Sequence, residues 1–136
     1  MIQISKNFTL SELVASITAA NYRIDNTPSP DVIINLVKLV ENTLQPIRDL
    51  WGNPVFVSSG YRNLKLNGLV GGSQNSQHIS GQAADISVGA SSNNKKLFEM
   101  IVKSNIPYDQ LIDESNYQWL HISYNADGNR KQILHL

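Results

Sequence analysis

Apolar residues recur at helical spacing in one long stretch of the chain, between residues 32 and 47. Positions 32, 33, 36, 37, 40, 44 and 47 are all Val, Ile or Leu, and a helix would place them on one face. Ser29 suits the N-cap, Pro30 suits the first helical position, and Gly52 provides a stop. The pattern therefore predicts one helix from Pro30 to about Trp51, with its apolar face in the core.

Shorter elements are predicted on both sides of this helix. Residues 9–12, TLSE, fit a capping box, so a short helix should follow them. Residues 92–104 have a helical pattern, whereas residues 63–82 are rich in Gly, Ser, Asn and Gln and are predicted to form a long loop. Strand patterns occur at residues 55–59, 83–88, 109–114 and 119–124. The last two strands flank a four-residue turn, which predicts a hairpin, and no pattern is clear after Tyr124.

Length and composition agree with one small domain. The chain has 136 residues, of which 41% are hydrophobic and 16% are charged, and this composition is typical of a globular protein. No repeat or internal linker divides the chain. Residues 1–136 are therefore predicted to form a single α+β domain, with a small central antiparallel sheet flanked by helices.

Charge, cysteine content and hydropathy exclude several classes of function. Eleven basic and eleven acidic residues cancel, so no long-range field would recruit nucleic acid or an anionic membrane surface. No stretch approaches about 18 apolar residues, so no membrane span is expected. The chain contains no cysteine, which excludes disulfides, thiolate metal sites and a cysteine nucleophile.

Two of the histidines lie where the predicted strands could bring them close to an aspartate. Side chains alternate along a strand, so Asp85 and His121 should both point away from the apolar residues beside them, which face the core. His78 lies in the polar loop, seven residues before Asp85. Two imidazoles and one carboxylate, with a fourth position left to water, make a normal catalytic zinc site. Histidines of this kind also occur as ordinary core or surface residues, and the pattern alone leaves both interpretations open.

The predicted hairpin adds a candidate general base. If Glu114 pairs with Trp119 across the turn, its side chain shares the face of His121, whereas Asp113 points the other way. A carboxylate near zinc-bound water can accept a proton from that water. Arg62 is a candidate for substrate binding, although a single arginine also fits a surface ion pair.

Three blocks of sequence, in order along the chain, carry a family resemblance. The blocks are SSGYR at residues 58–62, SQHISGQAADI at residues 76–86 and WLHIS at residues 119–123. They resemble the S-G-[YF]-R segment, the S-x-H-x-x-G-x-A-x-D-[IV] signature and the W-x-H-[IV]-S motif of D-Ala-D-Ala zinc metallopeptidases. This family belongs to the structural group that includes lysostaphin-type endopeptidases and the hedgehog signalling domain.

Further segments resemble a small single-domain subgroup that is common in bacteriophages and their hosts. These segments are NFTLSEL at 7–13, LQPIR at 44–48, VGGS at 70–73 and YDQLI at 108–112. With them, the resemblance extends from about residue 6 to residue 125.

The resemblance implies a role for each of several residues. It makes Arg62 the group that holds a substrate carboxylate or carbonyl, a task suited to a planar fork of donors. Ser76 is implied to hydrogen-bond the substrate, and Gly81 to allow a tight turn where a side chain would obstruct the metal. The implied zinc ligands are His78, Asp85 and His121.

One departure from the family pattern concerns the catalytic base. Many members carry Asp or Glu three residues before the second histidine, where this chain has Gln118. An amide cannot act as a carboxylate base. Glu114, seven residues before His121, is therefore the expected base, and Asp113 is the weaker substitute.

The resemblance implies a zinc-dependent hydrolase of peptide bonds in peptidoglycan stem peptides. It would act as a D,D- or L,D-carboxypeptidase or as an endopeptidase of endolysin type, with Glu114 moving the proton and Arg62 aligning the peptide. Two alternatives stay open: a non-catalytic wall-binding or virion structural module on the same fold, and a zinc peptidase of ordinary L-peptides. The N-terminal residues lack the pattern of a signal peptide, so we expect a cytoplasmic protein or one released to the cell wall by phage lysis.

Overall fold

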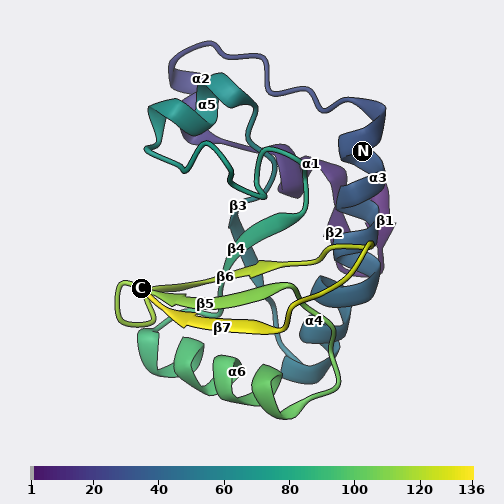
Figure 1. Cartoon of the computed structure of the whole chain (residues 1–136), viewed down its shortest axis with the longest axis vertical. Coiled ribbons are helices and arrows are strands. Elements are labelled where there is room, and N and C mark those ends of the chain that lie inside the picture. Colours follow the sequence, from purple (N-terminus) through teal and green to yellow (C-terminus); the bar gives the residue numbers. More distant parts are fainter. Residues whose placement is uncertain (1) are drawn as a thin grey trace.

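The computed structural model describes residues 2–136 and contains a five-stranded sheet flanked by helices (Figure 1). The strands follow the order β3-β4-β6-β5-β7 across the sheet. Their bounds are β3 (Phe56–Ser59), β4 (Ala83–Ser87), β5 (Gln110–Glu114), β6 (Trp119–Ser123) and β7 (Gln132–His135). Neighbouring strands are antiparallel except β5 and β7, which are parallel. The predicted α+β class is confirmed, and the C-terminal segment without a clear pattern adds a parallel edge strand.

Helices form the remainder of the fold, together with a small N-terminal strand pair. The pair consists of β1 (Gln3–Ser5) and β2 (Phe8–Thr9). The helices are α1 (Leu10–Val14), α2 (Ile17–Asn21), α3 (Pro30–Leu39), α4 (Gln45–Trp51), α5 (Leu64–Leu69) and α6 (Ser91–Lys103), and a π-helical turn, η1 (Val40–Leu44), joins α3 to α4. Within residues 2–136, no helix has the length and apolar character needed to cross a membrane.

The long helix predicted from the apolar stripe is present, but it contains an irregular turn. The Ser29 hydroxyl caps its start, and Gly52 ends it with a φ of +77°. In η1, the Gln45 N–H donates to the Val40 carbonyl, five residues back. Pro46 explains the irregularity, because proline has no N–H and its ring displaces the carbonyl four residues earlier. The predicted element is therefore confirmed as three consecutive helical segments.

The core lies between these helices and one face of the sheet. Apolar residues of α3, η1, α4 and α6 form one cluster with apolar residues of β4, β5 and β6. Fully buried members include Leu36, Leu39, Leu44, Ile47, Ala84, Ile86, Leu97, Ile101, Leu120 and Ile122. The alternation predicted for β4 and β6 is thus confirmed, and it leaves the intervening side chains on the opposite face.

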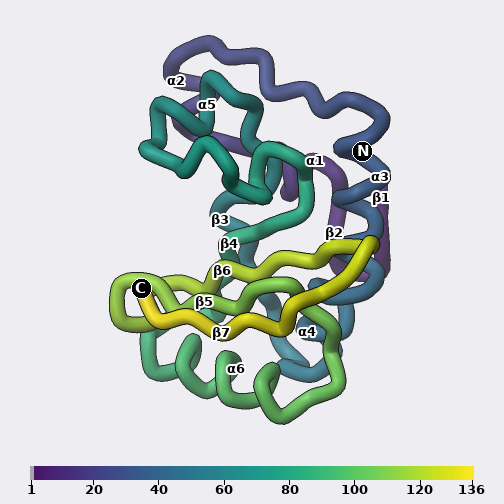
Figure 2. The backbone as a smooth tube through the Cα atoms, in the orientation of Figure 1, coloured from purple at the N-terminus to yellow at the C-terminus, as the bar shows by residue number. Residues whose placement is uncertain are grey.

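The loop predicted at residues 63–82 is wrong for its first third, which forms α5. The Asn63 side chain accepts a hydrogen bond from the Leu66 N–H at 2.8 Å and caps this short helix. Leu66 is buried, so a tertiary contact stabilises this short segment, and its leucines set it apart from the polar residues that follow. The remaining residues, 70–82, form the winding connection that leads into β4 (Figure 2).

The predicted hairpin is confirmed as β5 and β6, with Glu114 paired to Trp119. Its turn contains three consecutive residues in the left-handed region, at φ values of 50°, 57° and 65° for Ser115, Asn116 and Tyr117. Such conformations are unfavourable for residues with a side chain, so the surrounding structure must hold this turn in place.

Candidate metal centre

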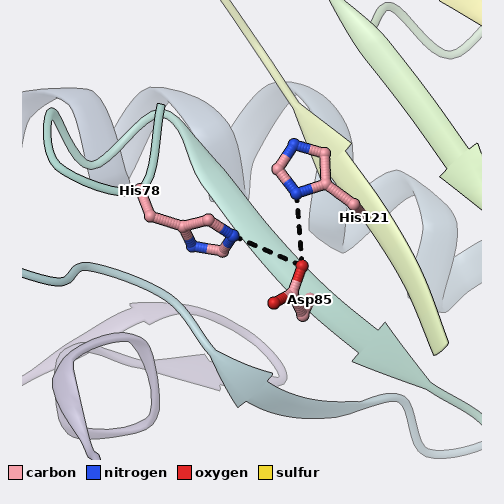
Figure 3. Close-up of side chains that lie close together, drawn as sticks. All are labelled: His78, Asp85 and His121. Carbon is pink, nitrogen blue, oxygen red and sulfur yellow. Dashed lines mark hydrogen bonds and ion pairs between the residues drawn. The ribbon is translucent and has the colours of Figure 1, made fainter. Parts of the chain in front are cut away.

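His78, Asp85 and His121 converge on one face of the sheet (Figure 3). Asp85 on β4 and His121 on β6 are direct partners across the strands, and His78 lies in the loop that leads into β4. Asp85 Oδ1 lies 3.3 Å from His78 Nε2 and 3.2 Å from His121 Nδ1. One ligand atom from each residue lies within 4.8 Å of the other two, so the group could hold a single metal ion.

A backbone carbonyl orients the His78 ring. His78 Nδ1 lies 2.6 Å from the carbonyl oxygen of Gly60, in a buried position. A carbonyl oxygen only accepts, so Nδ1 carries the hydrogen and Nε2 keeps its lone pair on the side of Asp85. Hydrogen bonding of the second ring nitrogen to a carbonyl is the arrangement typical of metal-binding histidines.

Asp85 is available as an anionic ligand. Its burial would raise the pKa of the carboxyl group, but the neighbouring His121 and His78 side chains outweigh burial and hold the pKa well below the ordinary value. The carboxylate is therefore ionised at neutral pH, as metal coordination requires.

The three residues open into a cleft of about 500 Å³. Arg62, Ser76 and Glu114, which were predicted from the sequence to act on the substrate or on water, line the same cleft. The Ser76 hydroxyl accepts a hydrogen bond from the His78 N–H at 3.1 Å, so it keeps its own hydrogen for another partner. The structure thus brings every predicted site residue to one place.

The two neighbouring carboxylates on β5 have different surroundings. Glu114 lines the cleft. Asp113 is buried instead and forms an ion pair with His135 on β7. His135, whose side chain is 66% exposed, does not line the cleft. Strand alternation therefore separates the two carboxylates as predicted, and the third histidine stays outside the candidate centre.

Arg62 is partly buried between acidic groups. Within residues 2–136, its Nε has no hydrogen-bond partner although it is shielded from solvent. Burial lowers the pKa of Arg62, while the negative charges of Asp85 and Glu114 act in the opposite direction. The guanidinium remains charged, and its planar donors suit a carboxylate or carbonyl of a bound molecule.

Gly81 adopts the left-handed conformation that the predicted tight turn requires, with a φ of +75°. The structure gives a packing reason for a glycine at this position. An added Cβ would lie 2.9 Å from both the backbone oxygen and a side-chain carbon of Val32 on α3. Gly81 is thus needed for packing on the long helix of the loop that carries the ligand His78, called the ligand loop below.

Other residues that support the cleft escaped the sequence analysis. A Cβ on Gly60 would lie 2.2 Å from the Leu13 carbonyl oxygen, so only glycine fits where its own carbonyl meets His78. The Asn94 side chain is buried and accepts a hydrogen bond from the Val88 N–H at 2.8 Å. Single asparagines in a polar helix give no signal of such a role. Gly60 could have been noticed, because it lies inside the SSGYR block.

The sequence was compared with curated proteins and with models of protein families. No curated protein matches the sequence. A sequence model of the family described as Peptidase M15 matches residues 6–123, which include His78, Asp85 and His121. The match covers most of the 136 residues and agrees with the resemblance seen in the three sequence blocks. The chain therefore belongs to the Peptidase M15 family.

Proposed function

We propose that this peptidase is a zinc-dependent hydrolase of peptide bonds in peptidoglycan stem peptides. One observation carries the proposal: the three candidate ligands, two histidines and an aspartate, line the same cleft as Glu114 and Arg62. Membership of the Peptidase M15 family supports peptide hydrolysis. The D-amino-acid peptide of the cell wall is the substrate class that the three sequence blocks imply.

The donor set fits zinc. Two imidazole nitrogens and one carboxylate oxygen are ligands that catalytic zinc commonly takes, with a further position left open. When bound, zinc would polarise the scissile carbonyl and lower the pKa of the attacking water. On the protein side, the hydrogen bond from His78 to Gly60 already directs the free ring nitrogen toward Asp85.

The residues around the ligands would divide the remaining tasks. Glu114 would accept a proton from the attacking water and deliver it to the leaving amine. Arg62 would hold a carboxylate or carbonyl of the peptide through paired N–H donors. Ser76 would donate its hydroxyl hydrogen to the peptide, since its oxygen already accepts from the His78 N–H.

Gln118 is the observation that favours a second function. It places an amide where many members of the family carry a carboxylate, as expected of a wall-binding module that has lost catalysis. The full ligand set and the position of Glu114 in the cleft favour hydrolysis.

Digestion of purified peptidoglycan tests the proposal. The zinc-loaded protein should generate new peptide termini, which mass spectrometry identifies. Release of terminal D-alanine would assign a carboxypeptidase, and cleavage within crosslinked peptides an endopeptidase. A zinc-loaded protein that binds peptidoglycan but cuts nothing would instead support the binding module.

A further inference from the structure

A second arginine lines the cleft in addition to Arg62. Arg130 lies on the segment between β6 and β7, beyond residues 6–123, which match the family. Its Nε donates to Asp109 Oδ1 at 3.0 Å and its Nη2 donates to Asp109 Oδ2 at 2.7 Å. The Arg130 backbone N–H also donates to Asp109 Oδ1, at 2.9 Å. A guanidinium held by this bidentate pair and by its own backbone has a fixed orientation.

Asp109 is far more buried than the arginine that it holds. Its side chain is 2% exposed, compared with 57% for Arg130. The same carboxylate accepts a hydrogen bond from Gln77 Nε2 at 2.8 Å, and Gln77 is the residue before the metal ligand His78. Burying a carboxylate is costly, so a buried ion pair is not by itself evidence that the pair is there for stability. The contacts of Asp109 with Arg130 and Gln77 hold the guanidinium in a fixed position beside the ligand loop.

The guanidinium keeps donors for a ligand. Asp109 uses the Nε hydrogen and one Nη2 hydrogen of Arg130, so both Nη1 hydrogens and the second Nη2 hydrogen are left. Asp109 also offsets the positive charge, so recognition would depend on short, directional hydrogen bonds more than on a long-range field. A planar group with several parallel N–H donors is best matched by a carboxylate.

We propose that Arg130 is a specificity-determining residue that binds a second carboxylate of the peptide substrate, separate from the group that Arg62 holds. This inference rests on the proposed function, because it assumes that a wall peptide occupies the cleft. Glu114 also lines the cleft and would repel a carboxylate placed beside it. Arg62 and Arg130 are the two arginines among the residues that line the cleft, and each would accept a substrate carboxylate through its N–H donors.

The test uses wall peptides in which each free carboxylate in turn is replaced by a carboxamide. With the zinc-loaded wild type, amidation of the group bound by Arg130 should lower kcat/KM about ten- to a hundredfold, mainly through KM. In Arg130→Gln the same amidation should have little effect, while amidation at other positions keeps its penalty. Lys131→Gln is the matched control. It removes the same charge one residue later, where Nζ lies over the Tyr108 ring, and it should keep wild-type selectivity.

Loss of Arg130 alone leaves the Asp109 carboxylate buried without its partner, which can unfold the protein. The double variant D109N/R130Q removes both charges and provides the second test. If Arg130 had only a structural role, its replacement would slow the cleavage of every peptide by the same factor. That result would overturn the inference about Arg130 and leave the proposed function intact. If the wild type cleaves none of the peptides, the proposed function fails. Calorimetry would then measure whether the protein binds the acid form of these peptides more tightly than the amide form. Equal affinity for the two forms would reject the proposed role of Arg130.

Discussion

Asp85 and His121 are partners on adjacent antiparallel strands, whereas His78 lies in a loop and depends on a hydrogen bond to Gly60. The strand pair places two ligands through backbone hydrogen bonds that side-chain changes barely affect. The third ligand is more vulnerable. It needs the Gly60 carbonyl in its place, and Gly60 in turn lies against the backbone at Leu13.

Gly60→Ala should therefore weaken both the fold and the metal centre. The new Cβ would lie 2.2 Å from the Leu13 oxygen, so the backbone must move and carry away the acceptor of His78 Nδ1. We expect a loss of about 1–3 kcal/mol in the free energy of unfolding, as for other overpacked sites, together with weaker zinc binding in chelator competition. Gly68→Ala is the control, since nothing lies within 4 Å of a Cβ there. Unchanged zinc affinity in Gly60→Ala would show that this carbonyl does not position His78.

Glu114→Gln tests the general base. The change keeps the size of the side chain and removes its ability to accept a proton, so the cleavage rate should fall at least about a hundredfold. Zinc content should stay near that of the wild type. Asp113→Asn is the matched comparison: its partner is His135, so it should affect thermal stability more than rate. A larger rate loss in Asp113→Asn than in Glu114→Gln would make Asp113 the base.

Among the elements, the β5–β6 hairpin determines where Glu114 points. Its turn contains three consecutive residues with positive φ, and a buried asparagine of α6 holds it. Asn94 Nδ2 donates to the carbonyl oxygens of Tyr117 and Gln118 at 2.9 Å and 3.1 Å. One side chain thus joins α6, the turn and the end of β4, where it also accepts from the Val88 N–H.

Asn94→Ala should loosen this turn. It leaves a buried N–H and two carbonyl groups without their partner, which typically costs about 1–3 kcal/mol in the free energy of unfolding. Because Glu114 directly precedes the turn, the cleavage rate should also fall, while zinc binding persists. Asn93→Ala, one position earlier in α6, serves as the control in denaturant titrations. If the two variants unfold at the same denaturant concentration, the Asn94 network does not stabilise the turn.

Elements with a clear period could be predicted, and several short ones could not. The apolar stripe of the long helix and the alternation along β4 and β6 predicted both the core and the direction of the ligands. By contrast, α2 and α5 have fewer than two helical turns, and β1 and β2 have three and two residues, so none of them is long enough to show its own period. Their stability comes from tertiary contacts, such as the burial of Leu66 in α5. The π-helical turn was also missed, although Pro46 indicates a local disturbance.

The same distinction applies to the candidate site. Strand alternation and the family blocks brought out the three ligands, Arg62, Ser76 and Glu114. Asp109 and Asn94 act through contacts with residues distant in sequence, and no local pattern reveals such contacts. Gly60 lies inside the SSGYR block, but its close approach to Leu13 is not visible in the sequence either. Strand β7 was missed for the same reason. It pairs with β5, and its His135 forms an ion pair with Asp113 of β5, a residue distant in sequence.

At the scale of the whole molecule, the segment after β6 closes one edge of the sheet and adds Arg130 to the cleft. The tube in Figure 2 shows it returning along β5 to the C-terminus, where the Leu136 N–H donates to the Asp113 carbonyl at 2.9 Å. Asp109 connects this segment to the ligand loop through Arg130 and Gln77. A single buried carboxylate thus joins parts of the chain that are distant in sequence.

This connection should make stability depend on pH in the acid range. Hydrogen bonds from Arg130 lower the pKa of Asp109 from 3.8 to about 2, against the effect of burial. Because the folded pKa is below the unfolded one, the stabilisation is present above about pH 4 and is lost as the pH falls toward 2. Denaturant titrations between pH 2 and pH 6 should show a steeper loss in the wild type than in D109N/R130Q. Equal slopes would mean that the Asp109 ion pair does not contribute.

A zinc titration of the metal-free protein, followed by cleavage of a wall peptide, tests the central claim most directly. One zinc ion per chain should restore cleavage, because His78, Asp85 and His121 form a single site. His121→Ala should lose both zinc and activity, whereas His135→Ala, changed outside the cleft, should keep both. Cleavage that persists in excess chelator, or full zinc binding by His121→Ala, would contradict the account.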